Sequence, residues 1–427
     1  MPDATLSLTP RRPVRRQDLA TAFDALVDGD ELHSLYQPLV ELDSGAVVGY
    51  EALARGPEGS PFARPDDLFL YARMVDRLGE LDWACRIAAI RGALEGAVPA
   101  PLRIFVNMEP EAIGLACPEQ HRAVWDRAAE LDLVVEVTER ALTARPADLV
   151  NALVAFREIG WGIALDDVGA DSRSLALLPL LRPDIVKLDL GLITARPSPK
   201  VAEIVAAVNA YAERTGAVVL AEGIETDAHL ARARAVGATH GQGWRFGHPA
   251  PLAADPPGGG PAMPRMRAPA QTTGTTPFEV VAPRRPVRRA TKPLLLEMTF
   301  QLERQAETLG ELALLLSAFQ TAERFTPATC RRYSRFAKRL AFVAGLGVGL
   351  DPEPAPGVRG AALADDDALA DEWSVVVLGP HFAGALVAVD LGDSGPDDER
   401  RFDYALTYDR DLVGAAANSL LRRVQPL

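Results

Sequence analysis

Over residues 17–252, short apolar runs alternate with longer stretches in which apolar residues recur at helical spacing. The apolar runs predict strands at 34–42, 47–54, 103–107, 133–138, 162–166, 185–188, 217–221 and near Gln242. The stretches between them predict helices, among them 78–94, 146–159 and 201–215. Strands that alternate with helices pair in parallel, so this region is predicted to form a closed, TIM-like β/α barrel.

The pattern changes after residue 252. Residues 253–290 are rich in proline, glycine and arginine and have no apolar period, which predicts a mobile linker. Residues 291–427 predict a smaller α/β domain, with a helix over 294–319, a strand hairpin over 373–378 and 384–390, and a final helix over 412–424. Residues 1–16 are predicted to be disordered. The hexapeptide RRPVRR precedes both domains, at 11–16 and 284–289, and compositional bias is its simplest explanation.

Composition and charge narrow the classes of function. The chain of 427 residues has a formal net charge of -13, which argues against a DNA-binding coat protein. An anionic substrate would therefore need local cations or metal ions. No apolar run approaches the roughly 20 residues of a membrane span, and the N-terminus lacks a secretory pattern. The three widely separated cysteines predict free thiols in a reducing cytoplasm.

Polar residues recur at the carboxyl ends of the predicted barrel strands. They follow the apolar runs in the same position each time: Glu51, Asn107, Glu136, Asp166, Asp167, Lys187, Glu222 and Gln242. Their spacing is close to one β/α unit from Asn107 onward. In a barrel the carboxyl ends of the strands meet at one rim, so these side chains are expected to converge there.

Five carboxylates without a nearby histidine or cysteine make an oxygen-rich site that suits Mg²⁺ or Mn²⁺. The adjacent Asp166 and Asp167 could bridge two ions, an arrangement that serves phosphoryl hydrolysis. Lys187 is one of four lysines among 45 lysine and arginine residues, which suggests a specifically placed ammonium group. Taken singly, each of these residues is more simply explained as a cap, a turn residue or a solvated charge. Their shared position favours a functional site.

Seven ordered motifs carry a family resemblance: YQPLVELDSGAVVGYEALAR, FVNMEPEAI, VVEVTERAL, IALDDVG, PDIVKLD, LAEGIET and GQGWRFGHP. Together they cover about residues 17–252 and resemble the EAL-domain phosphodiesterases, whose name is the triplet that begins at Glu51. The resemblance implies metal-dependent hydrolysis of cyclic di-GMP to linear pGpG. Family members commonly dimerise through the barrel, which leaves a homodimer open here.

The resemblance also implies roles for single residues. For one metal ion it implies four ligands: Glu51, Asn107, Glu136 and Asp166. For the second ion it implies that Asp166 and Asp167 contribute. Glu222 would be the general base, assisted by Lys187, and Gln242 would orient the attacking water. The implied substrate contacts are Arg55, Leu53 and Gln37. Glu139 would brace the loop after the paired aspartates, and Glu225 would support the site indirectly.

The loop after Asp167 departs from the family pattern DDFG-T/A-G-Y-S-S-L. Here Val168 replaces the Phe, Asp171 replaces the second Gly, and Ser172-Arg173 replaces Tyr-Ser. Asp adopts unusual backbone angles less freely than Gly, so the loop puts the regulation of the site in question. The alternative to an active enzyme is therefore a catalytically weak barrel that acts as a cyclic di-GMP receptor.

The C-terminal domain has a resemblance of its own. The segments AFQTAERFTPATCRRY, ADEWSVVVLGPHFAGALVAVDLGD and RRFDYALTYDRDLV resemble the DICT sensory domain, which occurs beside cyclic di-GMP and two-component modules. The resemblance implies that this domain modulates the barrel, with a signal or partner that the motifs do not identify.

Overall fold

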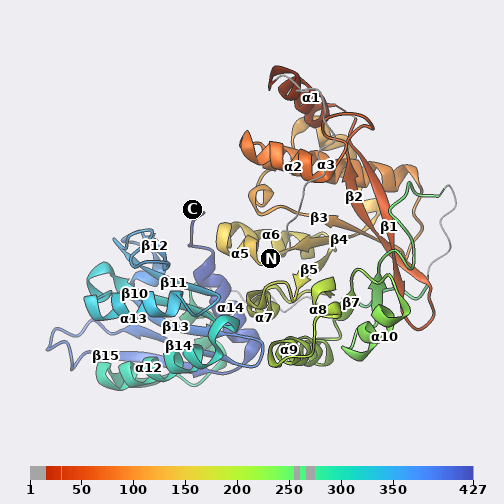
Figure 1. Ribbon diagram of the computed structural model, residues 1–427. Helices are drawn as coiled ribbons and strands as arrows, with labels where there is room; N and C mark the ends of the chain where they lie inside the picture. Colours follow the sequence, from red (N-terminus) through yellow and green to blue (C-terminus); the bar gives the residue numbers. More distant parts are fainter. Residues whose placement is uncertain (1–15, 30, 254–259, 266–274, 427) are drawn as a thin grey trace.

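The computed structural model describes residues 16–29, 31–253, 260–265 and 275–426, which form two domains in contact (Figure 1). The first is a closed barrel whose strands neighbour one another in sequence order. Its strands are β1 (His33–Glu41), β2 (Val47–Arg55), β3 (Arg103–Asn107), β4 (Asp132–Val137), β5 (Gly162–Val168), β6 (Ile185–Leu188), β7 (Val218–Ala221) and β8 (His240–Gln242). The predicted TIM-like fold is confirmed.

Strand β1 differs from the predicted parallel pairing, because it runs antiparallel to both β2 and β8. Only residues 42–46 join β1 to β2, and so short a connection allows a hairpin but no crossover. The turn is closed by the Glu41 amide, which donates to the carbonyl of Ala46, and Gly45 supplies a positive φ of 70°. The other neighbouring pairs, from β2–β3 to β7–β8, are parallel.

Helices connect and surround the barrel strands. They are α1 (Arg16–Asp28), α2 (Pro65–Met74), α3 (Leu78–Glu95), α4 (Arg122–Trp125), α5 (Arg140–Ala144), α6 (Pro146–Glu158), α7 (Leu178–Leu181), α8 (Leu190–Thr194), α9 (Pro199–Thr215) and α10 (Asp227–Ala235). The three helices predicted from the apolar spacing correspond to α3, α6 and α9. A short 3-10 helix, η4 (Ser172–Leu177), lies between β5 and α7.

The barrel interior is filled with apolar side chains below the rim. They come from alternate positions of the strands, because successive side chains of a strand point to opposite faces. The interior cluster comprises Leu39, Val48, Phe105, Val134, Ala164, Ile185, Val218, Leu220 and Met263. Met263 belongs to the predicted linker, and its carbonyl accepts a hydrogen bond of 2.9 Å from Arg103. This part of the linker therefore packs against the barrel.

The C-terminal domain is built on a seven-stranded sheet in the order β12-β11-β10-β13-β14-β15-β9. Its elements are α11 (Pro277–Val281), β9 (Arg288–Thr291), α12 (Lys292–Leu309), β10 (Leu314–Thr321), α13 (Pro327–Ala337), β11 (Phe342–Val348), β12 (Arg359–Leu363), β13 (Glu372–Leu378), β14 (Ala383–Asp390), β15 (Arg401–Thr407) and α14 (Arg410–Leu421). One apolar face of the sheet packs against α12 and α13, and the opposite face packs against α11 and α14.

The predicted helix over 294–319 is wrong in its second half. Helix α12 ends at Leu309, Gly310 follows with a positive φ of 58°, and residues 314–321 form the interior strand β10, between β11 and β13. The run LLLSAFQT is apolar on both faces because both faces of the sheet are covered, so helix and strand cannot be separated by periodicity there. The predicted hairpin is confirmed as β13 and β14, which pair antiparallel.

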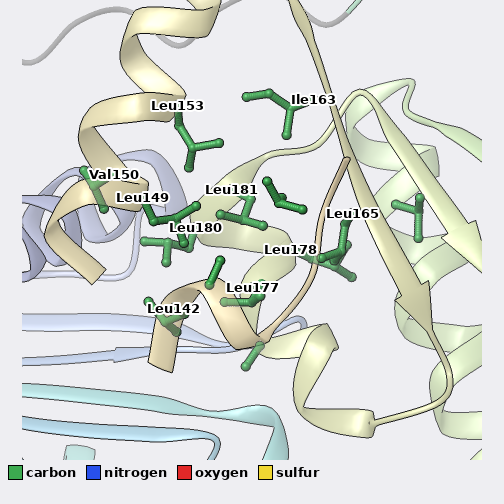
Figure 2. Packing of buried hydrophobic residues seen from close by; sticks show 14 of the residues in the cluster. Leu142, Leu149, Val150, Leu153, Ile163, Leu165, Leu177, Leu178, Leu180 and Leu181 are labelled. Atoms are coloured by element: carbon green, nitrogen blue, oxygen red, sulfur yellow. The ribbon is translucent and has the colours of Figure 1, made fainter. Parts of the chain in front are cut away.

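One hydrophobic cluster runs through both domains without interruption. It includes the leucines of η4 and α7 in the barrel domain and the apolar side of α14 in the C-terminal domain. Figure 2 shows Leu177, Leu178, Leu180 and Leu181 packed beside α6 and β5. The two domains therefore share buried apolar surface and are more than two modules joined by a linker.

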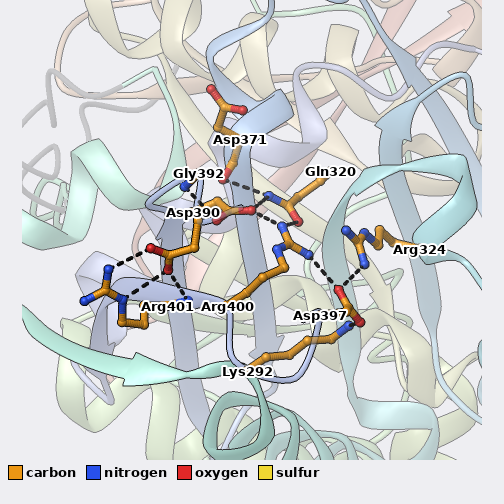
Figure 3. Close-up of polar contacts among 10 residues, drawn as sticks. Lys292, Gln320, Arg324, Asp371, Asp390, Gly392, Asp397, Arg400 and Arg401 are labelled. Atoms are coloured by element: carbon orange, nitrogen blue, oxygen red, sulfur yellow. Dashed lines mark hydrogen bonds and ion pairs between the residues drawn. The ribbon is translucent and has the colours of Figure 1, made fainter. Parts of the chain in front are cut away.

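A charged network ties together one end of the C-terminal sheet (Figure 3). Arg400 contacts Asp390 and donates to Gln320, at 3.1 Å. Asp397 pairs with Arg324 and with Lys292, and Asp393 pairs with Arg401. Each of these aspartates has at least one cationic partner, so none of the three is left unpaired.

Two expectations concern the environment of the chain. No helix within the described residues is long and apolar enough to cross a membrane. Cys85, Cys117 and Cys330 are free thiols, as the sequence predicts, and each is partly buried.

Candidate active site

The polar residues at the rim continue the alternation of the apolar interior. On β3, Phe105 fills the interior, and Asn107 lies one inward position further along at the rim. The same step of two residues connects four more pairs: Val134 and Glu136, Ala164 and Asp166, Ile185 and Lys187, and Leu220 and Glu222. Period-two alternation therefore places these polar residues, from β3 to β7, at one end of the barrel interior.

Lys187 lies at the centre of this group and is 1% exposed. Its Nζ is 2.6 Å from Glu136, 2.8 Å from Glu222 and 3.1 Å from Asp166. Glu51 is slightly further away, at 3.6 Å. One ammonium group thus contacts carboxylates from four different parts of the barrel wall, which confirms that these strand-end residues converge.

The charge at the rim is strongly unbalanced. Five carboxylates face one lysine, and burial raises the pKa of Glu136 well above its ordinary value, an effect that Glu51 reinforces. Burial also raises the pKa of Glu222 to about 8, against the opposing effect of Lys187. For Lys187 itself, burial acts to lower the pKa, but Asp166, Glu136 and the other carboxylates outweigh burial and raise it. Without a further cation, some of these carboxyl groups hold protons at neutral pH.

Glu51 is the exception among the buried carboxylates. Burial acts to raise its pKa, but Lys187 and two amide side chains hold the pKa below its ordinary value. Asn107 Nδ2 donates to one carboxylate oxygen at 3.1 Å, and Gln242 Nε2 donates to the other at 2.5 Å. Gln242 also donates to Gln37, whose own amide donates to the carbonyl of Gly247. Gln37 therefore fixes the orientation of Gln242 as well as lying near the rim.

Asp166, Asp167 and Glu222 offer the best-defined place for a divalent cation. One oxygen of each lies within 4.8 Å of the others. Asp167 is exposed at the rim, whereas the other two are partly buried. Both oxygens of Glu136 and Oδ1 of Asp166 are buried and, apart from ion pairs with Lys187, accept no hydrogen bond from the described residues. An all-oxygen set of this kind fits Mg²⁺ or Mn²⁺.

A cavity of about 250 Å³ opens beside the carboxylates, between the ends of β2 and β3 and helices α2 and α3. Leu53, Arg55 and Asn107 are among the residues that line it, so two of the three predicted substrate contacts, Leu53 and Arg55, lie at this cavity. The remaining lining includes residues that sequence reasoning missed: Phe69, Asp82, Cys85, Arg86 and Glu109. The only sequence signal for the Asp82–Arg86 ion pair, at 2.5 Å, is opposite charges four residues apart on a helix.

The two residues expected to support the site behave differently. Glu139 follows β4 and is close enough to raise the pKa of Asp167, although burial and Asp166 contribute more to that shift. Glu225 is exposed, and its backbone amide approaches His229 Nδ1 at 3.4 Å. Within the described parts of the chain, no side-chain contact joins Glu225 to the carboxylates.

The altered loop after Asp167 is not strained at the substituted glycine position. Asp171 has an extended φ of -125°, which any residue adopts, and Gly169 takes the positive φ of 111°. Asp171 instead acts as the N-cap of η4, since its Oδ1 accepts from the Arg173 amide at 2.9 Å. The strained residue is Asp167, with φ 56°.

Comparisons with known proteins agree with this geometry. Residues 16–249 match the EAL domain family, and residues 278–391 match the DICT family, a sensory domain in diguanylate cyclases and two-component systems. Among curated relatives, the cyclic di-GMP phosphodiesterase RocR of Pseudomonas aeruginosa is 28% identical over 264 residues, 57% of this chain and 67% of RocR. The cyclic di-GMP phosphodiesterase NbdA of the same species is 34% identical over 53% of this chain and 30% of NbdA.

Solved structures match about half of the chain. The BlrP1 complex with manganese and cyclic di-GMP from Klebsiella pneumoniae aligns with a TM-score of 0.46 and 28% identity, over 52% of this chain and 56% of that chain. The PaMucR phosphodiesterase in complex with c-di-GMP aligns with a TM-score of 0.47 and 26% identity, over 55% and 97%. The match to the EAL domain family covers residues 16–249, more than half of the 427 residues. The chain therefore belongs to the EAL domain family, and a DICT domain follows its barrel.

Proposed function

We propose that this protein hydrolyses cyclic di-GMP to linear pGpG, with two Mg²⁺ or Mn²⁺ ions, and that its C-terminal domain modulates the rate. The observation that carries the proposal is the convergence of Glu136, Asp166 and Glu222 on Lys187. A protein that only binds the nucleotide needs no buried base beside a lysine. The curated relatives named as cyclic di-GMP phosphodiesterases support the choice of substrate.

The family resemblance supplies the residues that would hold the two ions. Glu51, Asn107, Glu136 and Asp166 would hold one ion, and Asp166 and Asp167 would contribute to the second. When bound, the ions would supply positive charge to the phosphodiester and lower the pKa of water. Arg55, at the end of β2 beside the cavity, would bind a substrate phosphate.

Glu222 would accept the proton of the attacking water. Its carboxylate is 2.8 Å from Lys187 Nζ, and this contact holds it at the rim. Lys187 also favours the ionised form of Glu222, which a base requires, against the effect of burial. Gln242, itself held by Gln37, would orient the water.

The proposal is tested on the full-length protein, because the two domains share one hydrophobic cluster. Cyclic di-GMP is incubated with the protein and Mn²⁺, and pGpG is quantified by chromatography. Glu222→Gln should lower kcat by about a thousandfold with little change in substrate affinity, since the base acts on the reaction and not on binding. Glu203→Gln, on the exposed side of α9, is the matched control and should keep full turnover.

Nucleotide binding without pGpG formation by the wild-type protein would reject the enzyme in favour of a cyclic di-GMP receptor. Equal turnover by Glu222→Gln and the wild type would remove Glu222 from the role of base. The free cysteines agree with a cytoplasmic location, where cyclic di-GMP is hydrolysed in our proposal.

A further inference from the structure

The segment from Asp167 to Arg182, which connects β5 to β6, is strained at both ends. Asp167 and Arg182 are both non-glycine residues with left-handed backbone, at φ 56° and φ 50°. Such a conformation costs energy and persists only where neighbouring contacts enforce it. Asp167 is one of the candidate metal ligands, and Arg182 lies 15 residues further along, at the end of α7. The contacts that hold this segment are therefore relevant to the metal site.

The C-terminal domain supplies contacts to the far half of the segment. Helix α14 packs on α7 and α6, and the 3-10 helix η6 (Gly310–Leu312) packs on η4. At the strained Arg182, Nη1 pairs with Asp411 Oδ1 at 2.5 Å. A Cβ at Gly414 would lie 3.6 Å from the carbonyl oxygen of Pro179, so α14 approaches α7 closely at this point.

These contacts lie on one side of α14. Asp411, Gly414, Ala415 and Asn418 follow the spacing of one helix face, whereas Leu412, Val413 and Ala416 are fully buried. The first face is turned toward the barrel domain, as the contacts of Asp411 and Gly414 establish. The leucines of α7 are themselves buried, in the same hydrophobic cluster as the apolar residues of α14, so α7 has little freedom to move independently of α14.

Helix α7 contacts η4, and hydrogen bonds continue from η4 back to Asp167. Ser174 Oγ donates to the carbonyl of Asp171 at 2.7 Å, and Asp171 caps η4 through the Arg173 amide. An isolated parallel β-bridge pairs Val168 with Asp171, and the Ala170 amide donates to the carbonyl of Asp167 at 3.1 Å. The chain of contacts from α14 through α7 and η4 thus ends on the backbone of a candidate metal ligand.

We infer that α14 of the C-terminal domain is a positioning element for Asp167, acting through α7 and η4, with Gly414 and Asp411 as its positioning residues. The inference rests on the proposed function, because it takes Asp167 as a metal ligand. It specifies the route of regulation: a signal that shifts α14 relative to α7 changes metal affinity at the rim, while the buried carboxylates around Lys187 stay in place.

The test separates α14 from α7 by a single side chain. Gly414→Leu places a branched side chain against Pro179, whereas Gly414→Ala fits at the ordinary contact distance of 3.6 Å and is the matched control. Mn²⁺ affinity is measured by calorimetry without nucleotide, and hydrogen exchange is followed at the amides of residues 168–182. Gly414→Leu should weaken Mn²⁺ binding about tenfold and speed exchange in this segment, and Gly414→Ala should match the wild type.

A charge exchange gives a second test that does not depend on tolerance of a bulky side chain. Arg182→Asp and Asp411→Arg should each weaken Mn²⁺ binding by a smaller factor, about twofold to threefold, and the double variant should recover affinity. Folding of each variant is checked by circular dichroism and thermal unfolding.

The outcomes separate this inference from the proposed function. Folded Gly414→Leu with wild-type Mn²⁺ affinity and wild-type exchange, or a charge exchange without recovery, would overturn the positioning role and leave the metal site intact. No Mn²⁺ binding by the wild-type protein would overturn the metal site, and with it both proposals. Weaker binding by Gly414→Leu alone, with recovery in the double exchange variant, supports the route through α14.

Discussion

The barrel rim and the charged network at one end of the C-terminal sheet, called the sheet edge below, each gather carboxylates and cations, but in opposite proportions. At the rim, four carboxylates pair with one lysine, and Asp167 lies beside them as a fifth. At the sheet edge, three aspartates are matched by one lysine and three arginines: Asp390, Asp393 and Asp397, with Lys292, Arg324, Arg400 and Arg401 (Figure 3). The same types of side chain thus form a site with excess negative charge in one domain and a network in which each aspartate has a cationic partner in the other.

The difference appears in the proton affinities of the carboxyl groups. At the rim, burial raises the pKa of Glu136 and of Glu222, so these groups resist ionisation unless a cation is added. At the sheet edge, hydrogen bonds from Arg401 and from Lys292 lower the pKa of Asp393 and of Asp397. An unsatisfied cluster is an indication of a binding site, whereas a satisfied cluster is an indication of a structural role.

The largest effect is expected from removing the one cation at the rim. Lys187→Met leaves the buried carboxylates without a partner, so the metal-free protein should lose about 3 to 5 kcal/mol of unfolding free energy. Turnover should fall at least a hundredfold because Glu222 loses its partner. Thermal unfolding with and without Mn²⁺ checks this, and Mn²⁺ should raise the midpoint more in the variant than in the wild type. An unchanged midpoint without metal would mean that the rim does not depend on Lys187 for its charge balance.

A smaller effect is expected at the sheet edge, confined to stability. Arg400 has 12% of its side chain exposed, and Arg400→Ala removes the ion-pair partner of Asp390 and a hydrogen bond to Gln320, at a cost of about 2 to 4 kcal/mol. Arg401→Ala is the matched control, since this side chain is 53% exposed and water screens its ion pair with Asp393, so little stability should be lost. Denaturant unfolding measures both. A comparable loss in the two variants would contradict the structural role of the Arg400 contacts.

The smallest effect concerns pH. The pKa of Glu222 is raised to about 8, so below that pH the carboxyl group is protonated and its negative charge, which would attract the ions at the rim, is absent. Mn²⁺ affinity should therefore rise about tenfold from pH 6.5 to pH 8, with proton release on binding. Calorimetry in two buffers of different ionisation enthalpy counts the protons released. Affinity that is independent of pH would show that the carboxyl groups are already ionised before metal binds.

Much of the site could be predicted from sequence because it depends on regular structure. Strand ends in a β/α barrel meet at one rim, so Glu136, Asp166 and Lys187 could be brought together from their positions after apolar runs. The antiparallel β1 could not be predicted from periodicity, which reports burial and not strand direction. The helix wrongly extended through 310–319 has the same cause, since a strand buried on both faces has no alternation.

Contacts that depend on tertiary packing could not be predicted in this way. The Gln37–Gln242 hydrogen bond joins residues 205 positions apart, and although motifs mark each residue singly, no local sequence signal indicates that the two are partners. The close approach of Gly414 to Pro179 depends on how two domains meet, and a single glycine in a helix indicates no particular partner. The positive φ lies at Gly169 and not at the substituted Asp171, and this can be seen only in the folded backbone.

The shared hydrophobic cluster has a consequence for how the protein is made. Barrel strand β8 ends at Gln242, but the helix that covers α7 ends at Leu421, roughly 180 residues later. At translation rates of about 5 to 20 residues per second, the leucines of α7 stay exposed for roughly ten to forty seconds after the barrel is synthesised. During that interval the nascent chain presents an exposed apolar surface that chaperones or neighbouring chains can reach. Ribosomes that stop early would release a barrel prone to aggregation.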